Sequence, residues 1–163
     1  MELHPVVQQI KDLLTENAIA FSYFEHEAVR TSEEAHALRP GYELSQGAKA
    51  LIIKCKMEGG ERKFVQCIIP GDARLDNTSM KNATGAKNIS FATKEESDEI
   101  TSGIEFGGVP PFGNLFGLTV YMDPTLGKHD EILFNCGDRR ATIIMQFADY
   151  VKLVHPIETS LIQ

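Results

Sequence analysis

The sequence predicts an α/β protein of the α+β type, with a mixed, barrel-like β-sheet flanked by helices. Helical and strand-like segments are interspersed without the regular strand–helix alternation of a doubly wound fold. Several strand-like runs follow one another through short turns that are typical of hairpins. The chain has 163 residues, 42% of them hydrophobic, which is an ordinary size and composition for one domain. We therefore expect a single domain over residues 1–163.

The first quarter of the chain predicts two helices around one strand. Pro5 stands at a first helical position, and apolar residues at helical spacing follow it to about residue 17. Residues 20–25 predict a short strand. Thr31 and Glu34 have the spacing of a capping box, which predicts a helix to about Leu38.

The middle of the chain predicts a hairpin followed by two short helices. Residues 48–56 and 63–69 are strand-like runs separated by turn residues at 58–60. A helix over 77–83 is expected to end at Gly85, and a short strand covers 88–91. Thr93 and Glu96 form a second capping-box pattern, which predicts a helix to about residue 102 with Gly103 as its stop.

The last third predicts a shaped loop, three strands and a helix. Residues 106–117 contain four glycines and two prolines, so we expect no regular structure there. Residues 118–122, 131–135 and 141–146 predict strands, and residues 148–154 predict a helix. The tail after Pro156 is expected to fray.

Composition points to a soluble, cytoplasmic protein. No apolar run approaches the roughly 20 residues needed to span a bilayer, and no secretory signal precedes the first helix. Cys55 and Cys67 lie in buried strand patterns and Cys136 at a strand end; we interpret all three as reduced core thiols, with catalysis by Cys136 as the alternative. No zinc-like spacing of cysteines or histidines occurs, so we expect no metal, no cofactor and no membrane partner.

Charge is unevenly distributed along the chain. The net charge of −7 argues against a generally basic nucleic-acid-binding surface. Residues 47–91, however, carry eight basic and four acidic side chains. A locally positive face is feasible, and a mixed solvated surface fits the composition equally well.

The most distinctive segment is a run of seven residues that we call the Gly/Pro turn. Its glycines let the backbone approach a ligand and present N–H groups to an anion or oxyanion, while its prolines fix the shape in advance. The pattern matches neither a P-loop nor a dinucleotide fingerprint, and a loop shaped only for folding is the alternative. Its residues are Gly107, Gly108, Val109, Pro110, Pro111, Phe112 and Gly113.

Three further positions are candidates for chemistry. Lys49 stands where a polar stretch enters an apolar strand, so its ammonium either snorkels to solvent or faces a ligand in a cleft. His26 lies between two glutamates, and Arg139 with Arg140 suits either phosphate contact or a solvated hairpin. No Ser-His-Asp or Cys-His pattern with supporting local motifs stands out.

Several short pieces occur in a specific order between residues 25 and 154. They comprise Glu25 and His26, residues 31–35, residues 47–51 around Lys49, residues 70–72 with Leu75 and Asp76, residues 101–103, the Gly/Pro turn, and residues 135–137. Taken together they resemble the YbaK/EbsC family of aminoacyl-tRNA deacylases, which is related to the editing insertion of prolyl-tRNA synthetase.

The resemblance implies a site. In the family, a lysine holds the aminoacyl group of mischarged tRNA, and this lysine matches Lys49. A loop of the family that supplies backbone donors beside the ester matches the Gly/Pro turn. Gly103 and Gly137 match other pocket glycines, and His26 and Thr31 are carried over as substrate-binding. The attacking group is a ribose hydroxyl or a water, so Lys49 is expected to be a positioning cation and no protein nucleophile is needed.

The resemblance also implies partners and a class of substrate. A pocket excludes larger amino acids by size, which favours Ala- or Cys-tRNA(Pro) as substrate and prolyl-tRNA synthetase as an associated enzyme. Several relatives carry a histidine just after the glycine that matches Gly137, where this chain has Asp138 and Arg139. That difference argues against a histidine mechanism on this strand. A non-catalytic synthetase-associated module and an editing domain cut from a longer synthetase are the alternatives.

Overall fold

The computed structural model describes residues 2–28, 33, 34 and 40–163. Thr31, its capping box and most of the helix predicted to reach Leu38 lie outside these residues; Glu33 and Glu34 are helical.

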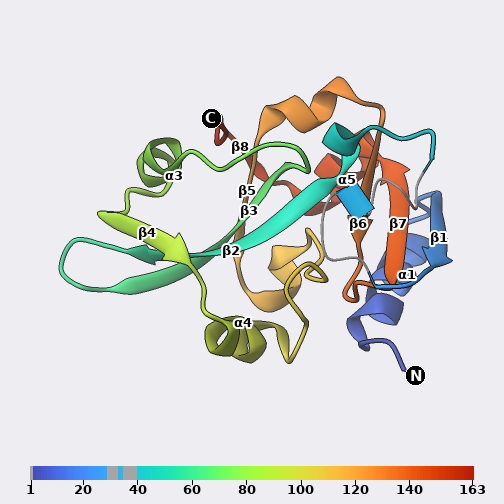
Figure 1. Ribbon diagram of the computed structural model, residues 1–163, viewed down its shortest axis with the longest axis horizontal. Coiled ribbons are helices and arrows are strands. Elements are labelled where there is room, and N and C mark those ends of the chain that lie inside the picture. Colours follow the sequence, from blue (N-terminus) through green and yellow to red (C-terminus); the bar gives the residue numbers. More distant parts are fainter. Residues whose placement is uncertain (1, 29–32, 35–39) are drawn as a thin grey trace.

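The described strands form two sheets (Figure 1). The larger has the order β4-β2-β3-β5-β8 and the smaller the order β1-β7-β6. β3–β5 and β5–β8 are parallel and the remaining pairs antiparallel, which confirms the predicted mixed sheet. A parallel bridge between Gly47 and Leu133 links the sheets, and they do not close into a barrel. The strands are β1 (Phe21–Glu25), β2 (Ala48–Lys56), β3 (Arg62–Pro70), β4 (Asn88–Phe91), β5 (Thr119–Met122), β6 (Glu131–Asn135), β7 (Ala141–Gln146) and β8 (Ile157–Glu158).

Helices flank these sheets. In Figure 1, α1 lies beside the β1-β7-β6 sheet at one end of the molecule, and α3 lies beside β4 at the other. The predicted caps are present: the Thr93–Glu96 box opens α4, and Gly85 ends α3 in a left-handed conformation. The bounds are α1 (Val6–Glu16), α3 (Asn77–Thr84), α4 (Lys94–Thr101) and α5 (Phe147–Val154). No helix of the described residues is long and apolar enough to cross a membrane.

Alternating side chains on β2 and β3 divide the core in two. One set, including Ala48 and Ile52, packs against α1, α5 and the Gly/Pro turn in the larger hydrophobic cluster. The other set, including Ile53 and Cys67, packs against Met80 of α3 in a smaller cluster. The face on which a β2 side chain lies therefore decides which part of the molecule it meets.

Two expectations were wrong. The tail does not fray: β8 pairs with β5, and Leu161 is fully buried, with its N–H donating to Asp123 Oδ2 at 2.8 Å. The segment 106–117 is not wholly irregular, because Gly113–Phe116 forms a short 3-10 helix that ends at Gly117 in a left-handed conformation. In both places the deciding contacts come from residues distant in sequence.

Candidate active site

Side chains from three separate elements hold the carbonyl groups of the Gly/Pro turn. Asn135 Nδ2 donates to Gly107 O at 2.6 Å, and Gln66 Nε2 donates to Pro110 O at 2.9 Å. The Tyr150 hydroxyl donates to Pro111 O at 2.5 Å. Gln66 also accepts from Gly113 N at 2.8 Å through Oε1. The turn is therefore preformed by β3, β6 and α5.

Several N–H groups of the same turn are left without an acceptor. Gly108 N donates to Glu105 O, but the N–H groups of Gly107, Val109 and Phe112 make no hydrogen bond within the described part of the chain. Gly107 is exposed, and residues 108–113 are buried. Buried donors without acceptors are uncommon in folded proteins, and a catalytic role is one explanation for them. The arrangement suits an oxygen that gains negative charge during a reaction.

Close packing explains two of the predicted site glycines. A Cβ on Gly113 would lie 2.9 Å from Gln66 Oε1 and 3.0 Å from Val120 Cγ2. Gly137 has a φ of 119°, and a Cβ there would lie 2.1 Å from Val6 Cγ1 of α1. Gly137 therefore has a packing role against α1.

His26 is linked to the Gly/Pro turn through two side chains. Its Nδ1 lies 2.7 Å from Glu27 O, so Nδ1 carries a proton, and its Nε2 lies 2.7 Å from Thr142 Oγ1. Thr142 is fully buried and lies 3.4 Å from Asn135 Oδ1. Asn135 in turn binds Gly107 O. His26 is thus linked to Gly107 of the turn through Thr142 and Asn135 and does not contact the turn itself in these hydrogen bonds.

Lys49 points its ammonium into a partly buried position near the end of β3. Its Nζ donates to Ala73 O at 2.8 Å, in the loop that follows β3. Burial lowers the pKa of Lys49, and the nearby Asp72 carboxylate opposes that shift. A cation in such a place is less hydrated than one on the surface, so it interacts more strongly with a ligand.

The structure does not place the Lys49 side chain against the Gly/Pro turn. Lys49 pairs with Ile69 and lies on the β2–β3 face of the smaller cluster, whereas Gln66 holds the turn on the opposite face. The strand that carries Lys49 and the strand that carries Asn135 are nevertheless neighbours, because their backbones are bridged. The Gly47–Leu133 bridge sets the start of β2 beside β6, two residues before Asn135. Thr31 lies outside the described residues, so its relation to this site is not defined.

Two groups that resemble nucleophiles lack the geometry for it. Ser45 Oγ lies 2.9 Å from His129 Nε2, but the Glu43 carboxylate also approaches Nε2, at 3.7 Å, instead of Nδ1 as in a catalytic triad. The three cysteines are buried and unpaired with one another, and burial raises the pKa of Cys67 to about 12. Cys67 therefore remains a thiol at neutral pH.

The pair Arg139 and Arg140 is not simply solvated, which the sequence had left open. Arg140 donates to Asp138 through Nε at 2.8 Å and Nη2 at 2.7 Å, and this pairing lowers the pKa of Asp138. Arg139 Nη2 lies 2.7 Å from Glu105 Oε2, and Glu105 stands two residues before Gly107, the first residue of the Gly/Pro turn. The two arginines thus brace the β6–β7 hairpin and its neighbouring loop.

Sequence reasoning missed the residues that shape the turn, namely Gln66, Thr142, Asn135 and Tyr150. A usable signal existed for Gln66, because it is a polar residue inside the apolar run 64–69 and is fully buried. No comparable signal marks Tyr150, whose partner is 39 residues away. Among the described residues, no group of three or more His, Cys, Asp or Glu side chains is placed to hold a metal ion.

The fold is shared with a protein of known structure. A crystal structure of a candidate trans-editing enzyme for prolyl-tRNA synthetase superposes with a TM-score of 0.82 at 27% identity, covering 99% of both chains. The class is thus that of small α+β editing domains.

Sequence comparison agrees with that class. The model of the aminoacyl-tRNA editing domain matches residues 26–153. The multifunctional Ser/Thr-tRNA deacylase ProXp-y of Escherichia coli is 36% identical over 151 residues, which cover 91% of this chain and 88% of the relative. The uncharacterised protein YwhH of Bacillus subtilis is 29% identical over 119 residues, 73% of this chain and 72% of that protein.

The chain belongs to the aminoacyl-tRNA editing domain family and is an aminoacyl-tRNA deacylase, an ester hydrolase that acts on mischarged tRNA. The resemblance to YbaK/EbsC proteins is confirmed. The alternative of a non-catalytic binding module is thereby set aside.

Proposed function

We propose that this deacylase removes small amino acids from tRNA in trans, with serine and threonine as the main substrates. The observation that carries the proposal is the 36% identity to a Ser/Thr-tRNA deacylase over 91% of the chain. Alanine and cysteine, expected from size alone, belong to the same size class and are secondary substrates. Rejecting a larger side chain requires only steric exclusion, which makes small amino acids the natural targets of such a pocket.

The proposed chemistry uses the free N–H groups of the Gly/Pro turn. An aminoacyl ester is already activated, so a positioned water attacks its carbonyl carbon and forms the new carbon–oxygen bond of the free amino acid. The carbonyl oxygen gains negative charge and accepts from the N–H of Gly107, at the exposed end of the turn. The ester bond to the tRNA ribose then breaks, and the ribose oxygen takes up the proton that the attacking water loses.

Lys49 acts in this scheme as a positioning cation. An ammonium has three donors, and Ala73 O accepts one of them. The lysine lies at the start of β2, beside the strand that carries Asn135. We place the 3′ end of the tRNA at this edge, where one of the remaining donors of the Lys49 ammonium binds an oxygen of the substrate.

The wider setting follows from the substrate. Residues 1–163 act as one editing domain in the cytoplasm, where aminoacyl-tRNA is made and used. Association with prolyl-tRNA synthetase is supported by the similar structure described as a trans-editing enzyme for that synthetase. In this view Gly103, His26 and Thr31 contribute to the substrate site, His26 through its link to the turn.

A substrate panel tests the proposal. Purified wild-type protein is incubated with seryl-, threonyl-, alanyl- and cysteinyl-tRNA on one tRNA body, with prolyl-tRNA as the correctly charged control. We expect the fastest hydrolysis for the seryl and threonyl esters and none above background for the prolyl ester. Preferred hydrolysis of the alanyl and cysteinyl esters would overturn the substrate assignment, and hydrolysis of none would overturn the function.

A further inference from the structure

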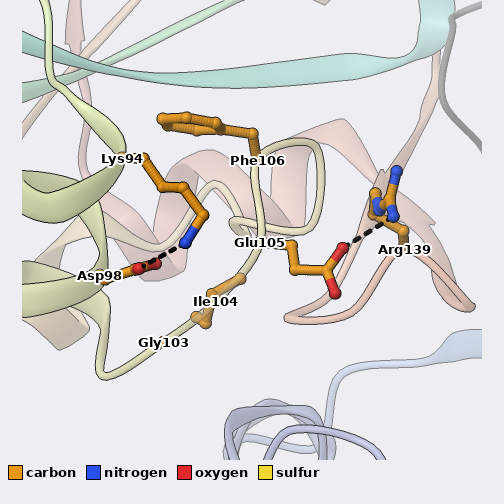
Figure 2. A pocket seen from close by; sticks show the side chains of 7 residues that line it. All are labelled: Lys94, Asp98, Gly103, Ile104, Glu105, Phe106 and Arg139. Carbon is orange, nitrogen blue, oxygen red and sulfur yellow. Dashed lines mark hydrogen bonds and ion pairs between the residues drawn. The ribbon is translucent and has the colours of Figure 1, made fainter.

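A pocket of about 400 Å³ opens beside the Gly/Pro turn, and its lining includes Gly103 and Arg139. Figure 2 shows Phe106 and Lys94 on one side of it and the Glu105–Arg139 pair on the other, with Gly103 and Ile104 between them. Asp98 completes the lining from α4. The pocket therefore collects an exposed aromatic ring, two cations and two carboxylates in one place.

The pocket is continuous with the exposed end of the turn. Phe106 directly precedes Gly107, and a Cβ on Gly107 would lie 3.3 Å from Arg139 Cδ. A Cβ on Gly108 would lie 3.3 Å from Arg139 N. A ligand group in the pocket thus lies next to the N–H that we assign to the ester oxygen.

The aromatic ring of Phe106 is unusually accessible. Its side chain is 54% exposed, while Phe112, only six residues away, is fully buried. An exposed ring on the rim of a concavity is a platform on which a flat, apolar face stacks, and nucleobases are such ligands.

The charged groups suit a neutral, polar base better than a phosphate. Lys94 pairs with Asp98 at 3.0 Å and Arg139 with Glu105 at 2.7 Å, so the lining carries no net charge. Exposed ion pairs of this kind are weak and can turn toward a ligand. Carboxylates accept from exocyclic amino groups, and the cations donate to ring nitrogens. Arg139 Nε is buried and has no acceptor within the described residues, which leaves a donor for such an atom.

We propose that this pocket binds the base of the 3′-terminal nucleotide of tRNA, stacked on Phe106 and flanked by Arg139 and Lys94. The inference rests on the proposed function, because the amino acid is esterified to the ribose of that nucleotide. The base must therefore lie within one nucleotide of the ester, which is where the pocket stands relative to Gly107.

Binding of two stable amide analogues tests the proposal. One is seryl-3′-amino-adenosine, and the other carries the same serylamide on a ribose without a base. Dissociation constants are measured by calorimetry for the wild type, Phe106→Ala and Phe106→Trp, with Phe91→Ala as the matched control. Phe91 is 62% exposed and does not line the pocket.

We expect Phe106→Ala to weaken binding of the adenosine analogue about tenfold, which is the size of one stacking contact. Phe106→Trp and Phe91→Ala should retain wild-type affinity, and the analogue without a base should be insensitive to Phe106. Equal weakening of both analogues by Phe106→Ala, or of neither, would overturn the pocket assignment. Hydrolysis of mischarged tRNA by the wild type is measured in parallel, so that failure of the proposed function is recognised separately.

Discussion

Asn135 is the side chain that ties strand β6 to the Gly/Pro turn. It holds Gly107 O at 2.6 Å, and Thr142 and His26 stand behind it. Hydrogen bonds of this kind fix a turn in one conformation, and preformed donors act on a transition state without a cost of reorganisation. Residues that never touch the substrate can therefore contribute to the rate.

The first prediction concerns Asn135→Ala. Removing the donor to Gly107 O should loosen the turn and lower kcat for deacylation about tenfold, the effect of roughly 1.4 kcal/mol on the barrier. Single-turnover kinetics on a mischarged tRNA measure it. Asn88→Ala, at an exposed position of β4, is the control and should leave kcat unchanged. An Asn135→Ala enzyme as fast as wild type would contradict the role of this contact.

The second prediction concerns the ion pair of Asp138 with Arg140. The pKa of Asp138 is lower in the folded state than in the unfolded chain, chiefly because Arg140 donates to its carboxylate. Its stabilisation is therefore complete at pH values well above about 3.9, the unfolded pKa, and is lost as the pH falls through the folded value.

Asp138→Asn should consequently lower the free energy of unfolding by about 1 kcal/mol at pH 7, as expected for a partly exposed pair. The difference from wild type should shrink as the pH is lowered below about 4. Urea unfolding at a series of pH values measures both quantities. A difference that is the same at pH 7 and at pH 3 would show that the charge of Asp138 is not responsible.

At the scale of elements, β3 and the Gly/Pro turn depend on one another. Gln66 is fully buried, and its amide satisfies both Pro110 O and Gly113 N. Gln66→Leu keeps the volume but leaves both backbone groups buried without partners. We expect a loss of roughly 2–5 kcal/mol in the free energy of unfolding, measured with urea, together with slower deacylation. Gln146→Leu, at the exposed end of β7, should change neither.

The tail is a second element whose packing can be measured. Leu161 is fully buried in the cluster that contains Met80 and Cys67. Leu161→Ala should cost about 2–4 kcal/mol in stability. Ile157→Ala, 47% exposed on the neighbouring β8, is the matched control and should cost well under 1 kcal/mol. If both variants were equally stable to urea, the tail would not be docked as described.

Elements that depend on local signals could be predicted from the sequence. The hairpin strands β2 and β3, the Thr93–Glu96 box and the Gly85 cap all rest on residues within a few positions of one another. The tail and the 3-10 helix at Gly113–Phe116 could not, because their partners are remote: Asp123 accepts from Leu161, and Gln66 accepts from Gly113.

Only part of the site could be predicted from the sequence, because some of its residues act through contacts that are remote in sequence. Lys49 and the Gly/Pro turn stand out as motifs, whereas Asn135, Thr142 and Tyr150 act through contacts formed only when the chain is folded. Strand alternation, which places Lys49 on the face opposite to Gln66, could be derived only once the register of β2 with β3 was known.

At the scale of the whole molecule, the net charge and the charge of one long segment have opposite signs. The net charge is −7, but the segment 47–91, which includes Lys49 and the whole β2–β3 hairpin, has an excess of basic residues. Basic residues of such a segment can attract a polyanion such as tRNA although the net charge of the protein repels it.

The central claim is that this chain hydrolyses aminoacyl-tRNA with Lys49 as a positioning cation. The most direct measurement is the single-turnover rate of seryl-tRNA hydrolysis by the wild type, Lys49→Met and Lys56→Met, the last replacing an exposed lysine on the same strand. Methionine keeps the apolar stem of Lys49 and removes only the ammonium. The account predicts a rate about 100-fold lower for Lys49→Met at unchanged thermal stability, and a wild-type rate for Lys56→Met. A Lys49→Met enzyme as fast as the wild type would contradict it.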